Sequence, residues 1–79
     1  MTRPVRVTDL RAVASLLEQL PVLLHETRVR RRLSQHDVAV DLGVSKNTVS
    51  NFEQGQGVTT STQRAVLLWL ADVEVRYQR

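Results

Sequence analysis

The stretch Gln35–Gln54 reads QHDVAVDLGVSKNTVSNFEQ, and it decides the fold expected from this sequence. Ser34 followed three residues later by Asp37 is a variant of the capping box, which predicts that a helix begins here. Gly43 stands where the chain needs a positive φ to leave that helix, and Ser45 can cap a second one. The stretch therefore predicts two short helices joined by a turn of three to four residues.

The apolar residues of this stretch are spaced so that the two helices share one core. Ala39 is small where the second helix must cross closely. The shared apolar wedge consists of Val38, Leu42, Val44, Val49 and Phe52. The outward side of the second helix is rich in short donor and acceptor groups: Lys46, Asn47, Thr48, Ser50 and Asn51. Such a pair of helices is a helix-turn-helix unit, here over residues 35–54.

Helical spacing of apolar residues continues on both sides of the unit. We expect a helix over about 8–20, capped by Thr8, and another over about 22–33, with Pro21 ending the first or opening the second. After a polar loop, a last helix is expected over about 62–77. The sequence predicts one compact all-α domain over residues 1–79, with about five helices, of which the N-terminal helix is an addition to the helix-turn-helix core.

Composition excludes several classes of protein. A chain of 79 residues without a nucleophile and base at usable spacing is expected to be neither an enzyme nor a cofactor carrier. It has no Cys, and His25 and His36 lack a third ligand, so we expect no metal site. No apolar run approaches the roughly 20 residues that span a bilayer. We therefore expect a soluble protein of a bacterial or phage-infected cytoplasm, with no membrane contact and no evident small-molecule ligand.

The positive charge is concentrated in one place. The net charge is +3, and the excess comes from the first forty residues, which hold seven basic and four acidic side chains. It is centred on Arg28–Arg32, a local patch that suits phosphate groups. We assign Arg30, Arg31 and Arg32 to phosphate contacts, the alternative being a solvated helix face.

Residues 33–55 resemble the phage-repressor (Cro-like, XRE) helix-turn-helix family. In that family a Ser-Gln pair, here Ser34-Gln35, opens the first helix of the motif, and an acid-X-Gly ending, here Glu53-Gln54-Gly55, closes the second. The likeness extends over roughly residues 22–70. It implies that the second helix enters the major groove of operator DNA.

The resemblance also implies roles for individual residues. Lys46, Asn47 and Asn51 would meet base edges, since Asn pairs with adenine and Lys donates to guanine. Ser50 is assigned to the bases as a secondary contact, whereas Gln35 and Thr48 are assigned to phosphates. The family pairs an Arg of the preceding helix with the Glu near the end of the recognition helix. The corresponding residues here are Arg28 and Glu53, which we expect to form a structural ion pair.

The sequence departs from the family pattern in three places. Arg32 stands where a Gly usually ends the helix before the Ser-Gln pair, and Thr27 stands where a large aliphatic residue is common. The third departure is at the ends of the domain, where the family's last short helix is not evident and an extra helix precedes the core.

The last helix suggests an assembly. Its apolar residues lie along two faces, and a band this wide can leave surface for a partner, so we expect a homodimer through the last helix, the N-terminal helix or both. The alternative is that the N-terminal helix covers the second face. Two domains about one DNA turn apart would read a palindrome.

These observations predict a sequence-specific DNA-binding transcriptional regulator, most simply a Cro-type repressor from a phage or prophage. One alternative is the antitoxin or plasmid-control subunit of a two-protein system. Another is a protein-interaction module that keeps a helix-turn-helix core without reading DNA.

Overall fold

The computed structural model describes the backbone of residues 7–77 and the side chains of residues 9–73. Over this part of the chain the fold is all-α, as predicted, with four helices where about five were expected. The helices are α1 (Val7–Arg30), α2 (Gln35–Leu42), α3 (Lys46–Glu53) and α4 (Thr60–Tyr77). The predicted cap at Thr8 concerns a side chain outside the described ones.

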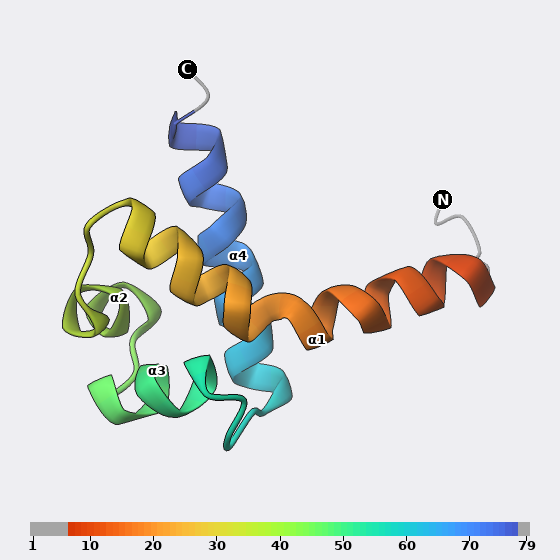
Figure 1. Ribbon diagram of the computed structural model, residues 1–79, viewed down its shortest axis with the longest axis horizontal. Helices are drawn as coiled ribbons and strands as arrows, with labels where there is room; N and C mark the ends of the chain where they lie inside the picture. The colour runs from red at the N-terminus through yellow and green to blue at the C-terminus, as the bar shows by residue number, and fades with distance from the viewer. Residues whose placement is uncertain (1–6, 78–79) are drawn as a thin grey trace.

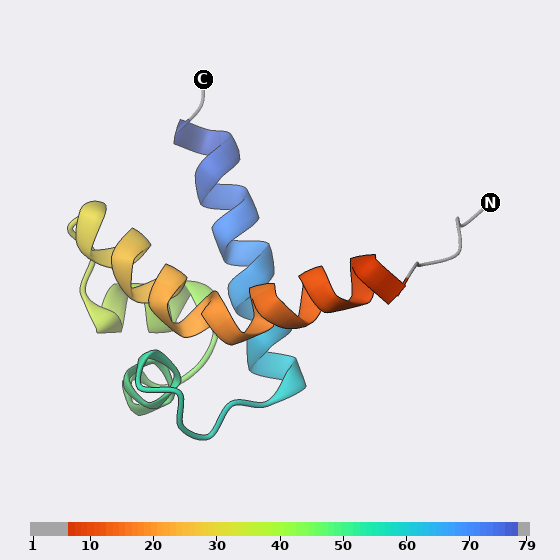
Figure 2. The same cartoon turned by 45° about the vertical axis from the view of Figure 1, so that its right-hand side comes forward.

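The predicted break at Pro21 is wrong, because α1 is a single helix with Pro21 inside it. Proline has no N–H to donate to the carbonyl of Leu17, and a proline inside a helix costs about 3 kcal/mol. Both views show α1 changing direction near its middle (Figures 1 and 2). Leu20 and Leu24 flank the proline and are fully buried. Burying two leucines stabilises the helix by about 3–6 kcal/mol, enough to offset the proline.

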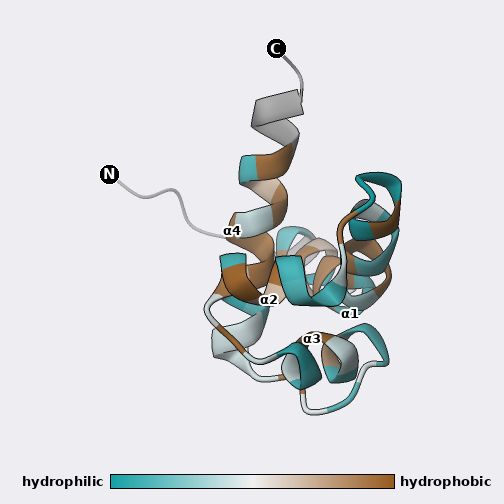
Figure 3. Ribbon diagram, turned by 90° about the vertical axis from the view of Figure 1, so that its left-hand side faces the viewer, coloured by the Kyte–Doolittle hydropathy of each residue, from teal (hydrophilic) through white to brown (hydrophobic). Residues whose placement is uncertain are grey.

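The core lies where α4 and the second half of α1 meet the α2–α3 pair. Figures 1 and 2 show α4 crossing α1, with α2 and α3 on the side of the C-terminal half of α1. The middle of α4 is strongly hydrophobic (Figure 3). The buried core consists of Leu20, Leu24, Val38, Ala39, Val49, Phe52, Val66, Trp69 and Val73. Trp69 is thus a core residue, and its Nε1 donates a hydrogen bond of 3.2 Å to Asp41 Oδ2.

The helix-turn-helix forms as the capping residues predict. The Ser34 hydroxyl accepts from the backbone N–H of Asp37 at 3.0 Å, and the Asp37 carboxylate accepts from the backbone N–H of Ser34 at 2.9 Å. The hydrogen bond from the Ser34 backbone N–H, with a smaller contribution from the Ser34 side chain, favours the ionised carboxylate and lowers the pKa of Asp37 from its usual value. Ser45 caps α3 by accepting from the backbone N–H of Thr48 at 3.1 Å.

Three successive helices end in the same hydrogen-bonded motif. After α2 the N–H of Gly43 bonds to Val40 and that of the next residue to Ala39, and α3 ends likewise at Gly55. Both glycines have positive φ, +72° and +76°. At the end of α1 the same position is taken by Arg32, whose φ is +58°. This left-handed residue ends α1 at Arg30, three residues before the predicted end.

Replacing Arg32 by Gly is expected to stabilise the domain by about 0.5–1 kcal/mol, because Gly adopts a positive φ without the cost of a Cβ. Thermal unfolding followed by circular dichroism should show a melting temperature a few degrees higher. As matched controls, Gly43→Ala and Gly55→Ala should destabilise through φ alone, since a Cβ there meets nothing within 4 Å. An unchanged or lower melting temperature for Arg32→Gly would contradict this account of the turn.

Candidate nucleic-acid interface

The helix α3 presents a polar face because its apolar residues are turned inward. Val49 and Phe52 are each 1% exposed, and they anchor the helix against the core. On the other side Lys46, Asn47 and Asn51 are exposed. Within the described part of the chain, no hydrogen bond or ion pair engages these three side chains. Their donors and acceptors are therefore available to a ligand.

Thr48 and Ser50 lie nearer the body of the domain. Both are half-buried, and the Thr48 hydroxyl lies 2.9 Å from the Ser45 hydroxyl. These two residues can reach a ligand only at the edge of the exposed face. Val49 and Phe52 are the two apolar residues of α3, and the ribbon of this helix in Figure 3 is otherwise hydrophilic or intermediate.

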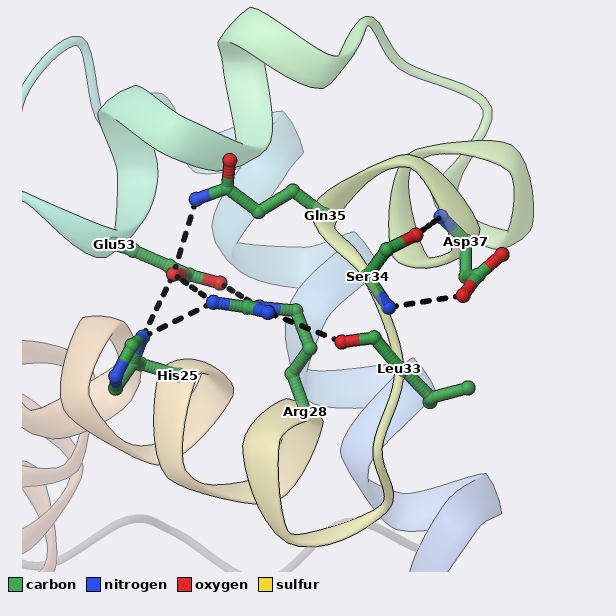
Figure 4. Close-up of polar contacts among 7 residues, drawn as sticks. All are labelled: His25, Arg28, Leu33, Ser34, Gln35, Asp37 and Glu53. Carbon is green, nitrogen blue, oxygen red and sulfur yellow. Dashed lines mark hydrogen bonds and ion pairs between the residues drawn. The ribbon is translucent and has the colours of Figure 1, made fainter.

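An ion pair between Arg28 and Glu53 fixes α3 to α1 (Figure 4). The Arg28 guanidinium donates to both Glu53 oxygens, from Nε at 2.7 Å and from Nη2 at 3.0 Å. A third donor of Arg28, Nη1, bonds to the Leu33 carbonyl at 3.0 Å. The glutamate side chain is 6% exposed and that of Arg28 is 13% exposed. One guanidinium therefore ties together α1, the turn before α2 and the last turn of α3.

Two further side chains reach the same carboxylate. His25 Nδ1 lies 2.9 Å from Glu53 Oε1, and Gln35 Nε2 donates to that oxygen at 3.3 Å (Figure 4). Burial alone would raise the pKa of Glu53, but the hydrogen bonds from Arg28, His25 and Gln35 outweigh it and lower the pKa. The pKa of Arg28 is raised, mainly by its hydrogen bond to Glu53.

The partners His25 and Gln35 were missed by the sequence analysis. His25 precedes Arg28 by three residues and so shares its face of α1, which is the signal that points to the cluster. Gln35 was assigned to a phosphate, and here one N–H of its amide is directed to Glu53. The amide keeps a second N–H at the N-terminus of α2, where an anion is favoured.

The arginine patch divides into two parts. Arg30 and Arg32 are exposed. Arg31 is half-buried and lines an open hollow of about 740 Å³ between α2 and α4, beside Asp41 and Trp69. The sequence assigns all three arginines to phosphates, whereas in the structure Arg30 and Arg32 are exposed and Arg31 is half-buried.

Comparison with known proteins places this geometry in a family. A family model described as a helix-turn-helix domain matches residues 19–73. The chain belongs to this helix-turn-helix domain family. The match begins within α1, so the first half of that helix extends beyond the family's domain. The extra N-terminal helix expected from the sequence is therefore the continuation of a helix of the helix-turn-helix domain.

A similar protein is found in Methanoculleus marisnigri, where it carries the provisional name HTH-type transcriptional regulatory protein. It is 51% identical to this chain over 37 residues, which are 47% of this chain and 12% of that protein. The likeness thus concerns one part of a much longer relative. No solved structure matches the chain significantly.

The described residues of this helix-turn-helix domain contain neither a candidate membrane-spanning helix nor a candidate metal cluster. No helix there combines the length and apolar character that crossing a membrane requires. No three His, Asp or Glu side chains there come together in a group that could hold a metal ion.

Proposed function

We propose that the chain is a sequence-specific DNA-binding transcriptional regulator that inserts α3 into the major groove. The observation that carries the proposal is the exposed row of Lys46, Asn47 and Asn51 on a helix held at both ends. Ser45 caps its start and the Arg28–Glu53 pair holds its last turn. A helix fixed in this way loses little conformational freedom when it binds a ligand, so less binding free energy is spent on ordering it. The name of the Methanoculleus relative supports the same function.

The base contacts in this proposal come from Lys46, Asn47, Ser50 and Asn51. Asn side chains can pair bidentately with adenine, and a Lys ammonium can donate to guanine O6 and N7. Phosphate contacts are assigned at the periphery of α3, to Gln35, Thr48, Arg30, Arg31 and Arg32. Arg31 is half-buried and would have to reach a phosphate from the edge of its hollow.

The finer form of the proposal is a Cro-type repressor of phage or prophage origin that binds as a homodimer and blocks its operator. Two copies with their α3 helices about 34 Å apart would read two half-sites of a palindrome. The chain would act through binding alone, without a cofactor or a catalytic step.

A test of the phosphate contacts is the salt dependence of binding. Changing Arg30 and Arg32 together to Gln is expected to weaken binding to all duplexes alike. The slope of log K against log salt should become about 1.8 units shallower if each arginine neutralises one phosphate. Fluorescence anisotropy with a labelled duplex at several salt concentrations measures this slope.

Arg11→Gln is the matched control, because Arg11 is an exposed arginine on the first half of α1, far from α3 along the chain. It should leave the slope unchanged. If the double variant kept the wild-type slope, Arg30 and Arg32 would belong to a solvated face.

A further inference from the structure

An apolar stripe on α1 continues past the edge of the folded domain. Leu24 and Leu20 are fully buried, and Leu17 is half-buried on the same face one turn earlier. The next residues of the stripe, Val13 and Leu10, are 50% and 55% exposed. The spacing of three and four residues keeps all five side chains on one side of the helix. The side that builds the core at one end of α1 is therefore uncovered at the other.

The uncovered part belongs to a projecting segment. In both views the first half of α1 extends beyond α4, on the side away from α2 and α3 (Figures 1 and 2). We call residues 7–17 the α1 arm. At 100° per residue Arg11 lies opposite the apolar stripe, whereas Asp9, near the start of the arm, lies about 60° from the centre of the stripe. The arm thus presents an apolar ridge of Leu10, Val13 and Leu17 with one carboxylate at its margin.

An apolar groove lies directly beside this ridge, between α1 and α4. It encloses about 380 Å³. Its lining consists of Leu17, Thr60, Gln63, Arg64, Leu67 and Leu68. Leu68 is 59% exposed, although it is a large aliphatic residue in the middle of α4. Since Leu17 belongs to both the ridge and the groove, the two form one continuous surface.

We infer that this surface binds a second copy of the chain, with the α1 arm of each copy in the groove of the other. A ridge beside a groove of the same character is self-complementary under a two-fold axis, as an isologous interface requires. The arm is only about 15 Å long and a helix is about 10 Å wide, so each copy buries less than the roughly 800 Å² of a standard interface. The dimer should therefore be weak and depend on concentration.

The inference gives the surface for the homodimer of the proposed function and in that respect rests on it. The arm projects away from α2 and α3, so pairing of two arms leaves both α3 faces free for DNA (Figure 1). The exposed apolar residues of the arm, Leu10, Val13 and Leu16, lie outside the residues that match the helix-turn-helix domain.

The experiment is sedimentation equilibrium of the full chain, without DNA, from about 5 to 200 µM. The wild type should rise with concentration from its monomer mass of 9.0 kDa towards twice that value. Leu10→Gln combined with Val13→Gln should raise the dissociation constant at least tenfold. Val22→Gln is the matched control, because Val22 is 57% exposed on the same helix but on the opposite side. Circular dichroism checks that each variant remains folded.

A cross-link identifies the partner surface. The chain has no Cys, so one copy carrying Val13→Cys mixed with another carrying Gln63→Cys should form a mixed disulfide on oxidation. The inference is overturned if the wild type stays monomeric up to 200 µM, or if Val22→Gln weakens the dimer as much as Leu10→Gln combined with Val13→Gln. A dimer that forms no mixed disulfide between Val13→Cys and Gln63→Cys also overturns it. A chain that dimerises through the arm but shows no base preference contradicts the proposed function and leaves this interface standing.

Discussion

Glu53→Ala is expected to lower the free energy of unfolding by about 3 kcal/mol, as loss of one partner from a buried ion pair usually does. The substitution leaves the Arg28 guanidinium enclosed without its carboxylate and removes the acceptor of His25 and Gln35. A domain of this size has a stability of only several kcal/mol, so a substantial unfolded fraction is expected at 37 °C. Urea denaturation followed by circular dichroism measures the change.

Glu53→Gln is the conservative counterpart and should cost less, because the amide oxygen still accepts one hydrogen bond from Arg28. Glu18→Ala removes an exposed carboxylate from the same domain and should change stability by less than about 0.5 kcal/mol. If Glu53→Ala abolished DNA binding with wild-type stability, the pair would belong to the binding surface and our structural assignment would be wrong.

The same pair predicts how stability depends on pH. The pKa of Glu53 is lower in the folded chain than its ordinary value, so the ionised carboxylate favours folding. This contribution is complete above the unfolded pKa of about 4.3 and is lost as the pH falls through the lower folded value. The pKa of Asp37 is also lowered in the folded chain, so its ionised carboxylate favours folding as well, and this contribution is likewise lost at low pH. Glu53→Gln should therefore show a shallower loss of stability between about pH 5 and 2 than the wild type.

Lys46→Ala and Asn47→Ala are each expected to cost about 1–3 kcal/mol of binding free energy on the cognate duplex, or roughly 5- to 150-fold in affinity. Each should also relax the base preference at one position, because the lost group is a base-edge donor or acceptor. Titration of wild type and variants on duplexes with single base-pair changes measures both effects. Neither variant should lose stability, since both side chains are exposed.

Gln19→Ala is the control for Asn47→Ala, because it removes an exposed side-chain amide from α1, away from the α3 face. It should bind like the wild type. If Asn47→Ala weakened binding to cognate and unrelated duplexes equally, Asn47 would contact a phosphate and not a base edge.

The helix-turn-helix could be predicted because its signals are local. Ser34, Asp37, Gly43 and Ser45 act on backbone groups within four residues, and the structure shows each in the expected bond or conformation. Prediction of a contact between Arg28 and Glu53, which lie 25 residues apart, needed the family pattern as well. Local patterns alone do not reveal that His25 and Gln35 share the carboxylate.

The course of α1 could not be predicted from local signals. Pro21 disfavours a helix interior, but α1 continues through it because Leu20 and Leu24 are buried in a core that α4 completes. At Arg32 the reverse holds, because the helix ends although no glycine stands there to indicate an end. A non-glycine residue with positive φ ends α1, because Leu33 bonds back to the Arg28 carbonyl and packs against the core. The strain of a single residue is small beside that packing.

Whether α3 reads DNA is tested by selection of bound sequences from a random duplex pool at about 0.15 M salt, with Asn47→Ala selected in parallel. We expect the wild type to enrich a palindrome with half-sites about one helical turn apart, and the variant to lose preference at one position of each half-site. No enrichment by the wild type, with the variant indistinguishable from it, would contradict the claim that α3 reads DNA.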